Sequence, residues 1–476
     1  MNTWAHDEMM GANVFDARRR ASLAVALLGL ADNPGTSFSA AVGPAKRQAI
    51  RRMFSSEKEG KDHNERIEIS DVLAGHSEQT RSRIKTGSSD GLVLMIQDTC
   101  QYSFNGLHMA TGLGYGTSLR ERCVFGHSML AVTTGGLPVG IAHLNIWARD
   151  DADFGKSDER RKVDVKDKES QKWITALQEA EKLLEPDQAV LFIQDREADI
   201  FAFMQAPTRE TSYLLIRAAQ PRKVEVCAGP DGAQSHTGLL FDVACAAPTV
   251  GRMRVTIPRA ANKPERTCDL LVQSIQVYIQ PPKDRKGVTN TPVKAWVVRA
   301  KEIDPPEGEK AIEWVLITTM PVTSSEDAYT MVRYYAKRWI IERLHYTIKT
   351  GACNAEKLQM DDVYSIKLAL ALYYVAGWRL LSMTYIARTE PEAPAARIMS
   401  PTEIDVLELL ARKPVKTVGL AVIEVAKLGG YEYYKNGPPP GVKRLGIGLR
   451  RLQDMEAGWL LAKQGRPLPR RLKYDT

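Results

Sequence analysis

Two short and nearly uninterrupted apolar runs stand out along the chain, because both end in the same three residues, Ile-Gln-Asp. They are GLVLMIQD at residues 91–98 and AVLFIQD at residues 189–195. Runs of this length, rich in Leu, Val and Ile, are typical of central strands that are covered on both faces of a sheet. We therefore expect two such strands, with Asp98 and Asp195 emerging at the points where the strands end.

The apolar pattern between and after these runs predicts the rest of a mixed α/β core. Residues 123–147 read as two strands joined across Thr-Thr-Gly-Gly, which is a hairpin signal. A helix is expected near residues 169–184 and a short strand at residues 212–217. From about residue 221 to residue 313, strand-like runs alternate with Pro, Gly and charged turns, so we expect a largely antiparallel β insertion there.

The N-terminal end of the chain reads as helical and basic up to about residue 75. One helix is expected from about Asp16 to Ala31 and another across Ala45 to Phe54. The run RRRASLAVALLGLA in the first helix superficially resembles a secretory signal, but it starts late, after acidic residues, and Asp16 is placed to cap a helix. Small basic helices of this kind often dock on duplex DNA, so we expect this segment to bind DNA.

Past residue 360 the pattern predicts one long apolar helix and then a small helical unit. The long helix, at residues 365–388, should close the core, and residues 389–398 read as a linker. Ser400 to Glu403 supply a capping box, and two further helices should end at Gly429-Gly430 and near Gln464. The apolar stripe of the final helix fits core packing and a dimer face equally well; its residues are Leu445, Ile447, Leu449, Leu452 and Trp459.

One helical stretch, YYAKRWIIERLHYTIK at residues 334–349, combines phosphate-binding residue types with a single metal-binding carboxylate. At about 100° per residue, four of its side chains fall within an arc of roughly 60° on one face. They are Tyr335, Arg338, Glu342 and Lys349. Arg, Lys and Tyr suit phosphate oxygens, and Glu supplies an oxygen ligand for a hard cation. From spacing alone, a solvated face with charge pairing between successive turns explains the pattern as well.

The two aspartates add weight to the metal-binding interpretation. A carboxylate at a buried strand end is costly, so a metal ion, an Arg partner or water must meet it. Taken singly, Asp98 and Asp195 also fit Asx turns or helix N-caps. Together with Glu342 they form a triad of oxygen ligands that suits Mg²⁺ or Mn²⁺.

These residues together resemble a known family. Asp98 in IQDT, Asp195 in QDREADIFAF and Glu342 within Y-x2-R-x3-E-x6-K, followed by Thr-Gly-Ala, are similar to the motifs of the DDE transposases. The resemblance is to the Tn-five-type branch of bacterial insertion-sequence enzymes, which is marked by the YREK signature. It covers nearly the whole chain, most strongly from about residue 90 to residue 352.

The resemblance implies a fold class and a domain layout. The fold would be α/β, with an RNase H-like mixed-sheet catalytic core flanked by helical domains. The implied layout is an N-terminal helical DNA-binding domain at 1–75, a catalytic domain at 76–388 with its β insertion at about 221–313, and a C-terminal helical domain at 389–476 that serves for dimerisation.

The resemblance also implies a chemistry. Asp98, Asp195 and Glu342 would hold two Mg²⁺ ions, with Mn²⁺ as a substitute, for cleaving transposon ends through a DNA hairpin and joining the 3′ ends to target DNA. The partner is double-stranded DNA, and because the chain carries one triad, a homodimer bridging two DNA ends is expected. The residues expected to contact DNA are Tyr335, Arg338, Lys349, Trp314 and Arg217. Trp314, at the exit of the insertion, reads equally as a core residue or as a platform for an unstacked base.

Charge and composition agree with a polyanionic partner without requiring one. The 476 residues carry 65 Lys and Arg against 57 Asp and Glu, a formal charge of +8. Basic residues gather near both termini, although solvated helix faces explain any single group of them: Arg18 to Arg20, Lys46, Arg47, Arg51, Arg52, Lys443, Arg444, Arg450, Arg451, Arg470 and Arg471. Six Cys form no CxxC pair, and no apolar run approaches the roughly 20 residues that span a bilayer. We expect a cytoplasmic, nucleoid-associated bacterial protein with no membrane partner.

Two other functions share these features. An RNase H-like nuclease that cuts without joining would keep the same carboxylates. A DNA-binding inhibitor or regulator of transposition would bind the ends and cleave nothing, although the intact triad argues against it. Neither the end sequence nor the target preference can be read from the chain.

Overall fold

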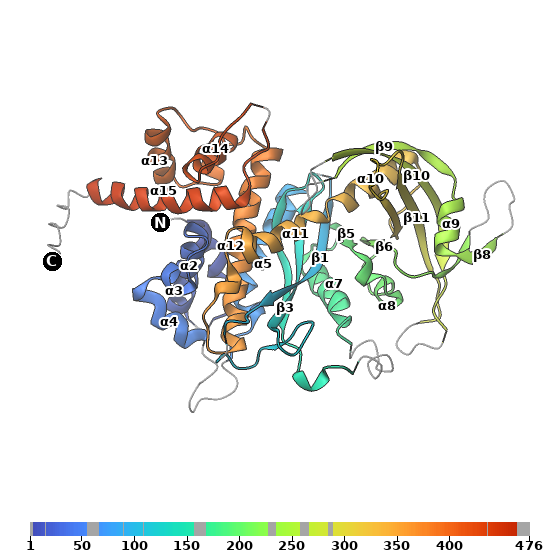
Figure 1. The fold of residues 1–476 in the computed structure, drawn as a ribbon, viewed down its shortest axis with the longest axis horizontal. Coiled ribbons are helices and arrows are strands. Elements are labelled where there is room, and N and C mark those ends of the chain that lie inside the picture. The colour runs from blue at the N-terminus through green and yellow to red at the C-terminus, as the bar shows by residue number, and fades with distance from the viewer. Residues whose placement is uncertain are drawn as a thin grey trace.

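A mixed sheet of twelve strands runs through the described part of the computed structural model, with helices on both of its faces (Figure 1). Three neighbouring strands, β1 (Leu92–Ser103), β5 (Ala189–Gln194) and β6 (Ser212–Arg217), run parallel, and the other described strand pairs are antiparallel. The mixed α/β class that the sequence predicts is thereby confirmed. The structure describes residues 3–14, 16–54, 66–88, 90–107, 109–156, 168–226, 235–257, 266–283, 289–435 and 437–463.

The strand run at residues 91–98 is longer than predicted, and Asp98 does not lie at its end. β1 continues to Ser103, because β3 (Arg122–Thr133) pairs with it antiparallel along almost its full length. The parallel pairing with β5 stops earlier, at Ile96. Asp98 is therefore at the point where β1 loses one neighbour and keeps the other, whereas Asp195 does follow the last residue of β5, as expected.

The predicted hairpin is confirmed on the outer side of β1. β3 and β4 (Pro138–Trp147) pair antiparallel on either side of the Thr-Thr-Gly-Gly turn. Gly136 in this turn has φ of 100°, a value that only glycine adopts without strain. A short strand, β2 (Gly114–Tyr115), pairs with the far end of β3.

The β insertion is antiparallel, as predicted, but it extends the main sheet. β12 (Glu313–Thr318) pairs with β6, and β11 (Val293–Glu302) pairs with β12. One hydrogen-bonded ladder therefore joins the insertion to the strands that carry the aspartates. The remaining strands are β10 (Arg266–Ile279), which pairs with β11, β7 (Lys223–Val226), β8 (His236–Leu239) and β9 (Thr249–Ile257).

Two apolar cores lie on opposite faces of the sheet. Successive residues of β1 divide between them: Val93 and Met95 contribute to one core, Leu94 and Ile96 to the other. The first core lies under the helices α7 (Gln171–Leu183), α8 (Phe201–Met204) and α9 (Leu240–Ala246). The second lies under α10 (Ser325–Ala336), α11 (Trp339–Tyr346) and α12 (Val363–Thr389), and α5 (Ile69–Gly87) contributes to both.

Helix α12 is the helix around which the other helices gather. The pattern predicts a long apolar helix that closes the core, and this is confirmed, because most of its 27 residues are buried. By length and composition it is the one helix among the described residues that could cross a membrane. However, 83% of its most apolar stretch is buried inside the structure, so it is a core helix here.

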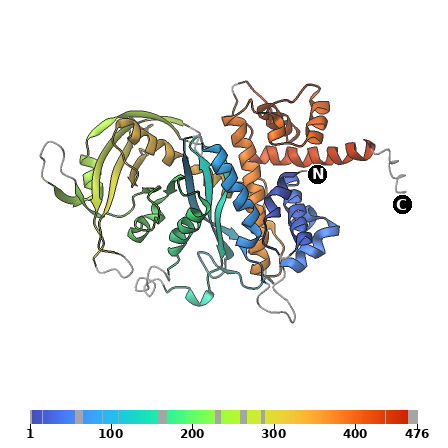
Figure 2. The same ribbon diagram turned by 180° about the vertical axis from the view of Figure 1, so that it is seen from behind.

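Helices from both ends of the chain pack against α12 (Figures 1 and 2). Asp16 caps its helix as predicted, since its carboxylate accepts a hydrogen bond from the Arg19 amide, and the capping box of Ser400 and Glu403 is also present. The N-terminal helices are α1 (Thr3–Met10), α2 (Ala17–Asp32), α3 (Phe38–Val42) and α4 (Pro44–Phe54), and the C-terminal helices are α13 (Pro401–Ala411), α14 (Val418–Leu428) and α15 (Val442–Lys463).

The final helix uses the first half of its apolar stripe as core. Leu445, Leu449 and Leu452 are buried, and Trp459 is half-buried. The contact with α14 is close, because a Cβ atom on Gly448 would lie 1.8 Å from the Val425 carbonyl oxygen.

We predict that Gly448→Ala destabilises the packing of α14 on α15 by about 1 to 3 kcal/mol, because the added methyl group meets rigid backbone. Gly458→Ala in the same helix is the matched control. Nothing lies within 4 Å of its added Cβ, so it should stabilise the helix by about 0.5 to 1 kcal/mol. Thermal denaturation and hydrogen exchange of α14 and α15 measure both effects. Equal behaviour of the two variants would contradict this packing.

Candidate active site

Asp98 and Asp195 lie next to each other where the parallel pairing of β1 and β5 ends. The last paired residues are Ile96 and Ile193, and each aspartate follows two positions later in its own chain segment. Asp98 accepts a hydrogen bond from the Thr99 amide (2.8 Å), and Asp195 accepts one from the Glu197 amide (2.8 Å) at the start of a 3₁₀ turn. The repeated Ile-Gln-Asp sequence therefore places two carboxylates at one edge of the parallel strands.

Glu342 comes from a helical segment that is interrupted, and the expected single helix over residues 334–349 is wrong in this respect. α10 ends at Ala336 and α11 begins at Trp339, with tight hydrogen bonds from the Lys337 and Arg338 amides three residues back. Residues 347–351 then form a π-helical turn. Tyr335, Glu342 and Lys349 therefore lie on three successive helical pieces instead of one continuous face.

Arg338 lies between two of the carboxylates. Its guanidinium is 2.5 Å from Glu342 Oε1 and 3.8 Å from Asp98 Oδ2, and its side chain is only 11% exposed. A planar cation that is buried in this way joins the helical segment to the strand. Asp98, Glu342 and Arg338 thus lie together, although the sequence predicted a phosphate contact for Arg338 and not a pairing with the carboxylates.

The surroundings of Asp98 disfavour its ionised form. Burial, and then the charges of Asp195 and Glu342, raise the pKa of the Asp98 carboxyl to about 7 against the opposing effects of the Thr99 amide and Arg338. An aspartate with so high a pKa is short of positive charge, which is common at functional sites.

The residues fit a hard divalent cation by their chemistry. Asp98, Asp195 and Glu342 offer carboxylate oxygens, which are the ligands that Mg²⁺ and Mn²⁺ prefer. Within the described residues, no three His, Cys, Asp or Glu side chains are already close enough together to hold an ion. Asp98 and Glu342 face the Arg338 guanidinium instead. The donor set therefore suits a cation, and Arg338 supplies part of the positive charge that such a site needs.

Tyr335 and Trp314 form an aromatic pair beside Arg338. Their rings meet edge to face with centroids 5.2 Å apart, and both residues are buried, with Trp314 only 7% exposed. The face of Trp314 is therefore covered and is not open to a base in this arrangement. The Tyr335 hydroxyl and Arg338 Nε are buried beside the carboxylates and make no hydrogen bond of normal geometry within the described residues.

Arg217 and Lys349 lie at the edges of this group. Arg217, at the end of β6, donates to the Glu313 carbonyl oxygen (3.1 Å) and is close enough to lower the pKa of Tyr335, which burial raises. Lys349 donates to the Gln101 carbonyl oxygen (2.7 Å) and pairs with Glu356 (3.2 Å). Lys349 is thus fastened to the extension of β1 and not to the carboxylates.

A buried polar layer behind the carboxylates was not predicted. Gln97 and Gln194, one residue before each aspartate, are fully buried, and Gln97 Oε1 lies 3.0 Å from His127 Nε2. On the side of α11, Ser128 Oγ lies 2.9 Å from His345 Nε2. Burial, and then the charges of Lys349 and Arg338, lower the pKa of His345 to about 3, so its ring is neutral near pH 7. The repeated Gln was visible in the sequence, whereas nothing local marked the serine and the histidines.

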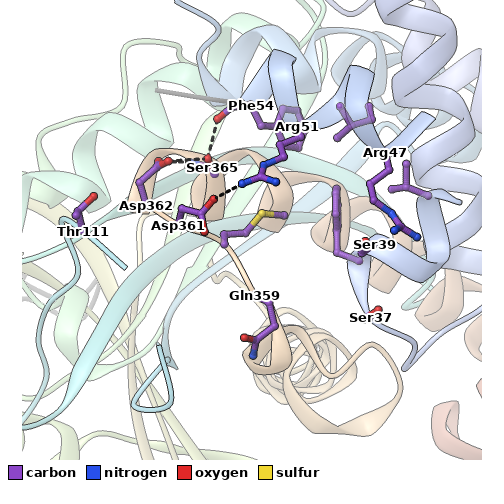
Figure 3. A pocket seen from close by; sticks show the side chains of 14 residues that line it. Ser37, Ser39, Arg47, Arg51, Phe54, Thr111, Gln359, Asp361, Asp362 and Ser365 are labelled. Carbon is purple, nitrogen blue, oxygen red and sulfur yellow. Dashed lines mark hydrogen bonds and ion pairs between the residues drawn. The ribbon is translucent and has the colours of Figure 1, made fainter. Parts of the chain in front are cut away.

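The basic residues of the N-terminal helices lie apart from this group. Arg47 and Arg51 of α4 line a cavity of about 720 Å³ between α3, α4 and residues 359–365, in which Arg51 pairs with Asp361 at 3.0 Å (Figure 3). Both partners of this pair are largely exposed, so it contributes little to stability. Arg470 and Arg471 lie outside the described residues.

No model of a known protein family matches the chain. The residue geometry is therefore the evidence on which a function has to rest.

We predict that Asp98→Asn stabilises the metal-free protein at pH 8. An unfolded aspartate titrates near pH 3.9, so with a folded pKa of about 7 this group's contribution to stability is full below pH 4 and is lost as the pH rises through 7. The amide escapes that loss and should gain about 1 to 4 kcal/mol at pH 8, with the gain disappearing near pH 4.

The measurement is thermal denaturation in EDTA across this pH range. Asp199→Asn is the matched control, since Asp199 is buried but pairs with Arg222 and accepts two backbone hydrogen bonds. It should lose about 3 to 5 kcal/mol. Destabilisation by Asp98→Asn at pH 8 would show that the Asp98 charge is already balanced.

Proposed function

We propose that this chain is a DDE-type transposase that cuts DNA at transposon ends and joins the freed 3′ ends to target DNA. The observation that carries the proposal is that Asp98 and Asp195, from two parallel strands, lie on the same side of the site as Glu342, which reaches Asp98 through the shared Arg338. A purely structural ion pair needs one carboxylate for one arginine. Here two carboxylates share the single guanidinium of Arg338 and a third lies near Asp98, so negative charge is in excess. A surplus of negative charge around the largely buried Asp98 suits a site whose task is to bind cations.

The catalytic core is proposed to be RNase H-like. Support comes from the order of the central strands, in which antiparallel β3 lies beside β1, and β5 and β6 follow in parallel. It also comes from the placement of the carboxylates. Asp98 lies on β1, Asp195 follows β5, and Glu342 lies on α11, which covers one face of the sheet. The YREK resemblance agrees with this assignment.

Asp98, Asp195 and Glu342 would hold the metal ions of the reaction, and Arg338 would hold the DNA phosphate beside them. Two bound Mg²⁺ ions would supply activation of the attacking oxygen and stabilisation of the leaving oxygen. Arg338 has a planar guanidinium whose N–H groups can donate hydrogen bonds to two phosphate oxygens. Its Nε has no other partner of normal geometry among the described residues. The Tyr335 hydroxyl, which lies close to Arg338 and Arg217, would offer a further hydrogen bond at the same place.

The remaining DNA contacts would come from the edges of the site and from the chain ends. A phosphate oxygen would compete with Gln101 and Glu356 for the Lys349 ammonium, and Arg217 would meet the strand near Tyr335. Arg18, Arg47 and other basic residues of the N-terminal helices are exposed, which suits contact with the duplex.

The working unit is proposed to be a homodimer that bridges two DNA ends, acting on the bacterial nucleoid in the cytoplasm. One chain carries one set of three carboxylates, and cutting two ends together needs two. The outer half of α15 carries Met455, Leu460 and Leu461, each at least 40% exposed, which suits a pairing surface.

The test is to incubate the protein and Mg²⁺ with a linear fragment carrying its gene and the natural flanking DNA, together with a supercoiled target plasmid. Joined fragment–plasmid products at the flanking ends support the proposal. Cutting without joining would identify a nuclease instead, and binding without cutting would identify a regulator.

We predict that Glu342→Gln keeps DNA binding but lowers cleavage to below about one hundredth of the wild-type rate, because a neutral amide cannot complete the charge that holds the metal ions. Glu326→Gln on α10 is the matched control, since Glu326 is exposed and pairs with the exposed Arg333, away from the carboxylates. Single-turnover cleavage and gel-shift titration compare the two variants. Wild-type cleavage by Glu342→Gln would remove Glu342 from the site.

A further inference from the structure

Within the described part of the chain, a buried hydrogen bond connects the helix that carries Glu342 with the strand pair that carries Asp98. It joins Ser128 Oγ of β3 to His345 Nε2 of α11 over 2.9 Å. Ser128 is fully buried and His345 is 7% exposed, so water does not compete for the bond. A buried bond of this kind is costly to break, because water cannot take the place of either partner.

Both partners stand next to a carboxylate of the proposed active site. Ser128 is directly opposite Asp98 in the antiparallel register of β1 and β3. His345 follows Glu342 by three residues on α11, so the two side chains leave the helix on neighbouring positions of one side. The bond therefore links the position across from Asp98 with the position one turn beyond Glu342.

Apolar packing also holds α11 on the sheet, through Ile341 and Leu344. The other polar connections between these two elements are weaker or more exposed. Arg338 lies 3.8 Å from Asp98, which is a loose ion pair. Lys349 reaches the Gln101 carbonyl oxygen from the π-helical turn, but its side chain is 31% exposed. α11 itself is only eight residues long and is interrupted at both ends. Such a short helix depends on side-chain contacts for its position against the sheet.

We propose that His345, through its bond to Ser128, is the positioning residue that sets the distance between Glu342 and Asp98. Neither His345 nor Ser128 touches DNA or metal in this role. The bond holds the carboxylate of Glu342 opposite that of Asp98, so that both can share one cation. The expected effect on cleavage rate rests on the proposed function. The positioning role adds to that function the contact that sets the spacing of the carboxylates.

The experiment is a double-mutant cycle with Ser128→Ala, His345→Leu and the combined variant, and with His345→Gln as the conservative replacement. A glutamine amide can place a polar atom near the position of Nε2, whereas leucine cannot. Four properties are measured: the single-turnover cleavage rate on the flanking-DNA fragment, the Kd for that fragment, the affinity for Mn²⁺ alone by electron paramagnetic resonance, and the melting temperature.

The expected result is a loss of about 10- to 100-fold in cleavage rate and in Mn²⁺ affinity for each of Ser128→Ala and His345→Leu. The combined variant should be no worse than either single variant, because both remove the same bond. His345→Gln should recover most of the loss, and the Kd for DNA should stay within about twofold. Thr80→Val, which removes a buried hydroxyl bonded to the His76 carbonyl oxygen, is the control for general destabilisation.

Three outcomes would overturn the inference: additive losses in the combined variant, equal losses for His345→Gln and His345→Leu, or a loss in Thr80→Val of the same size. If the wild-type protein cleaves nothing, the proposed function fails, but the Mn²⁺ affinities still decide on the positioning role. An unchanged Mn²⁺ affinity in all variants of a protein that binds Mn²⁺ would then reject it.

Discussion

The cost of ionising the largely buried Asp98 beside two further carboxylates is the constraint around which the candidate site is organised. Burial raises the pKa of the Asp98 carboxyl, and the charges of Asp195 and Glu342 act in the same direction. An apolar or fully paired arrangement at this place would make the protein more stable, so the carboxylates point to a function that offsets the lost stability. Arg338 relieves part of the repulsion by facing two of the three groups. A divalent cation would relieve the rest, which is why charge is the strongest argument for the proposed chemistry.

The position of Asp98 depends on the different lengths over which β1 pairs with its two neighbours. β1 has a parallel neighbour only as far as Ile96, but its antiparallel neighbour β3 supports it to Ser103. Asp98 therefore lies beyond the parallel pairing with β5 but is still hydrogen-bonded within the strand pair of β1 and β3, which fixes its position. The same extension gives Lys349 its anchor at Gln101. α11 packs against α12, and helices from both ends of the chain also pack against α12. Rigid elements on both sides suit a site that must hold ions at fixed distances.

Much of this was predictable from the sequence, and the limits have physical causes. Apolar runs and caps gave the central strands, the hairpin, the long core helix and the C-terminal helices, because local pattern determines those elements. The extension of β1 was missed, because past Asp98 the strand is supported by β3, whose contact is not local. The break between α10 and α11 was missed, since helical periodicity continues across it. Trp314 was left open between core and surface, and its burial against Tyr335 depends on strand pairing. The Ser128–His345 bond joins residues 217 positions apart, beyond any local pattern.

The proposal that three carboxylates form one cation site is tested most directly by a crystal structure of the protein soaked with Mn²⁺, recorded at a wavelength where manganese scatters anomalously. An anomalous peak about 2.0 to 2.3 Å from oxygens of Asp98, Asp195 and Glu342, with Arg338 turned away from Asp98, is the predicted result. An absence of manganese at a concentration that saturates the protein, with Arg338 still facing Asp98 and Glu342, would contradict it. In that case the cluster would be a structural ion-pair network.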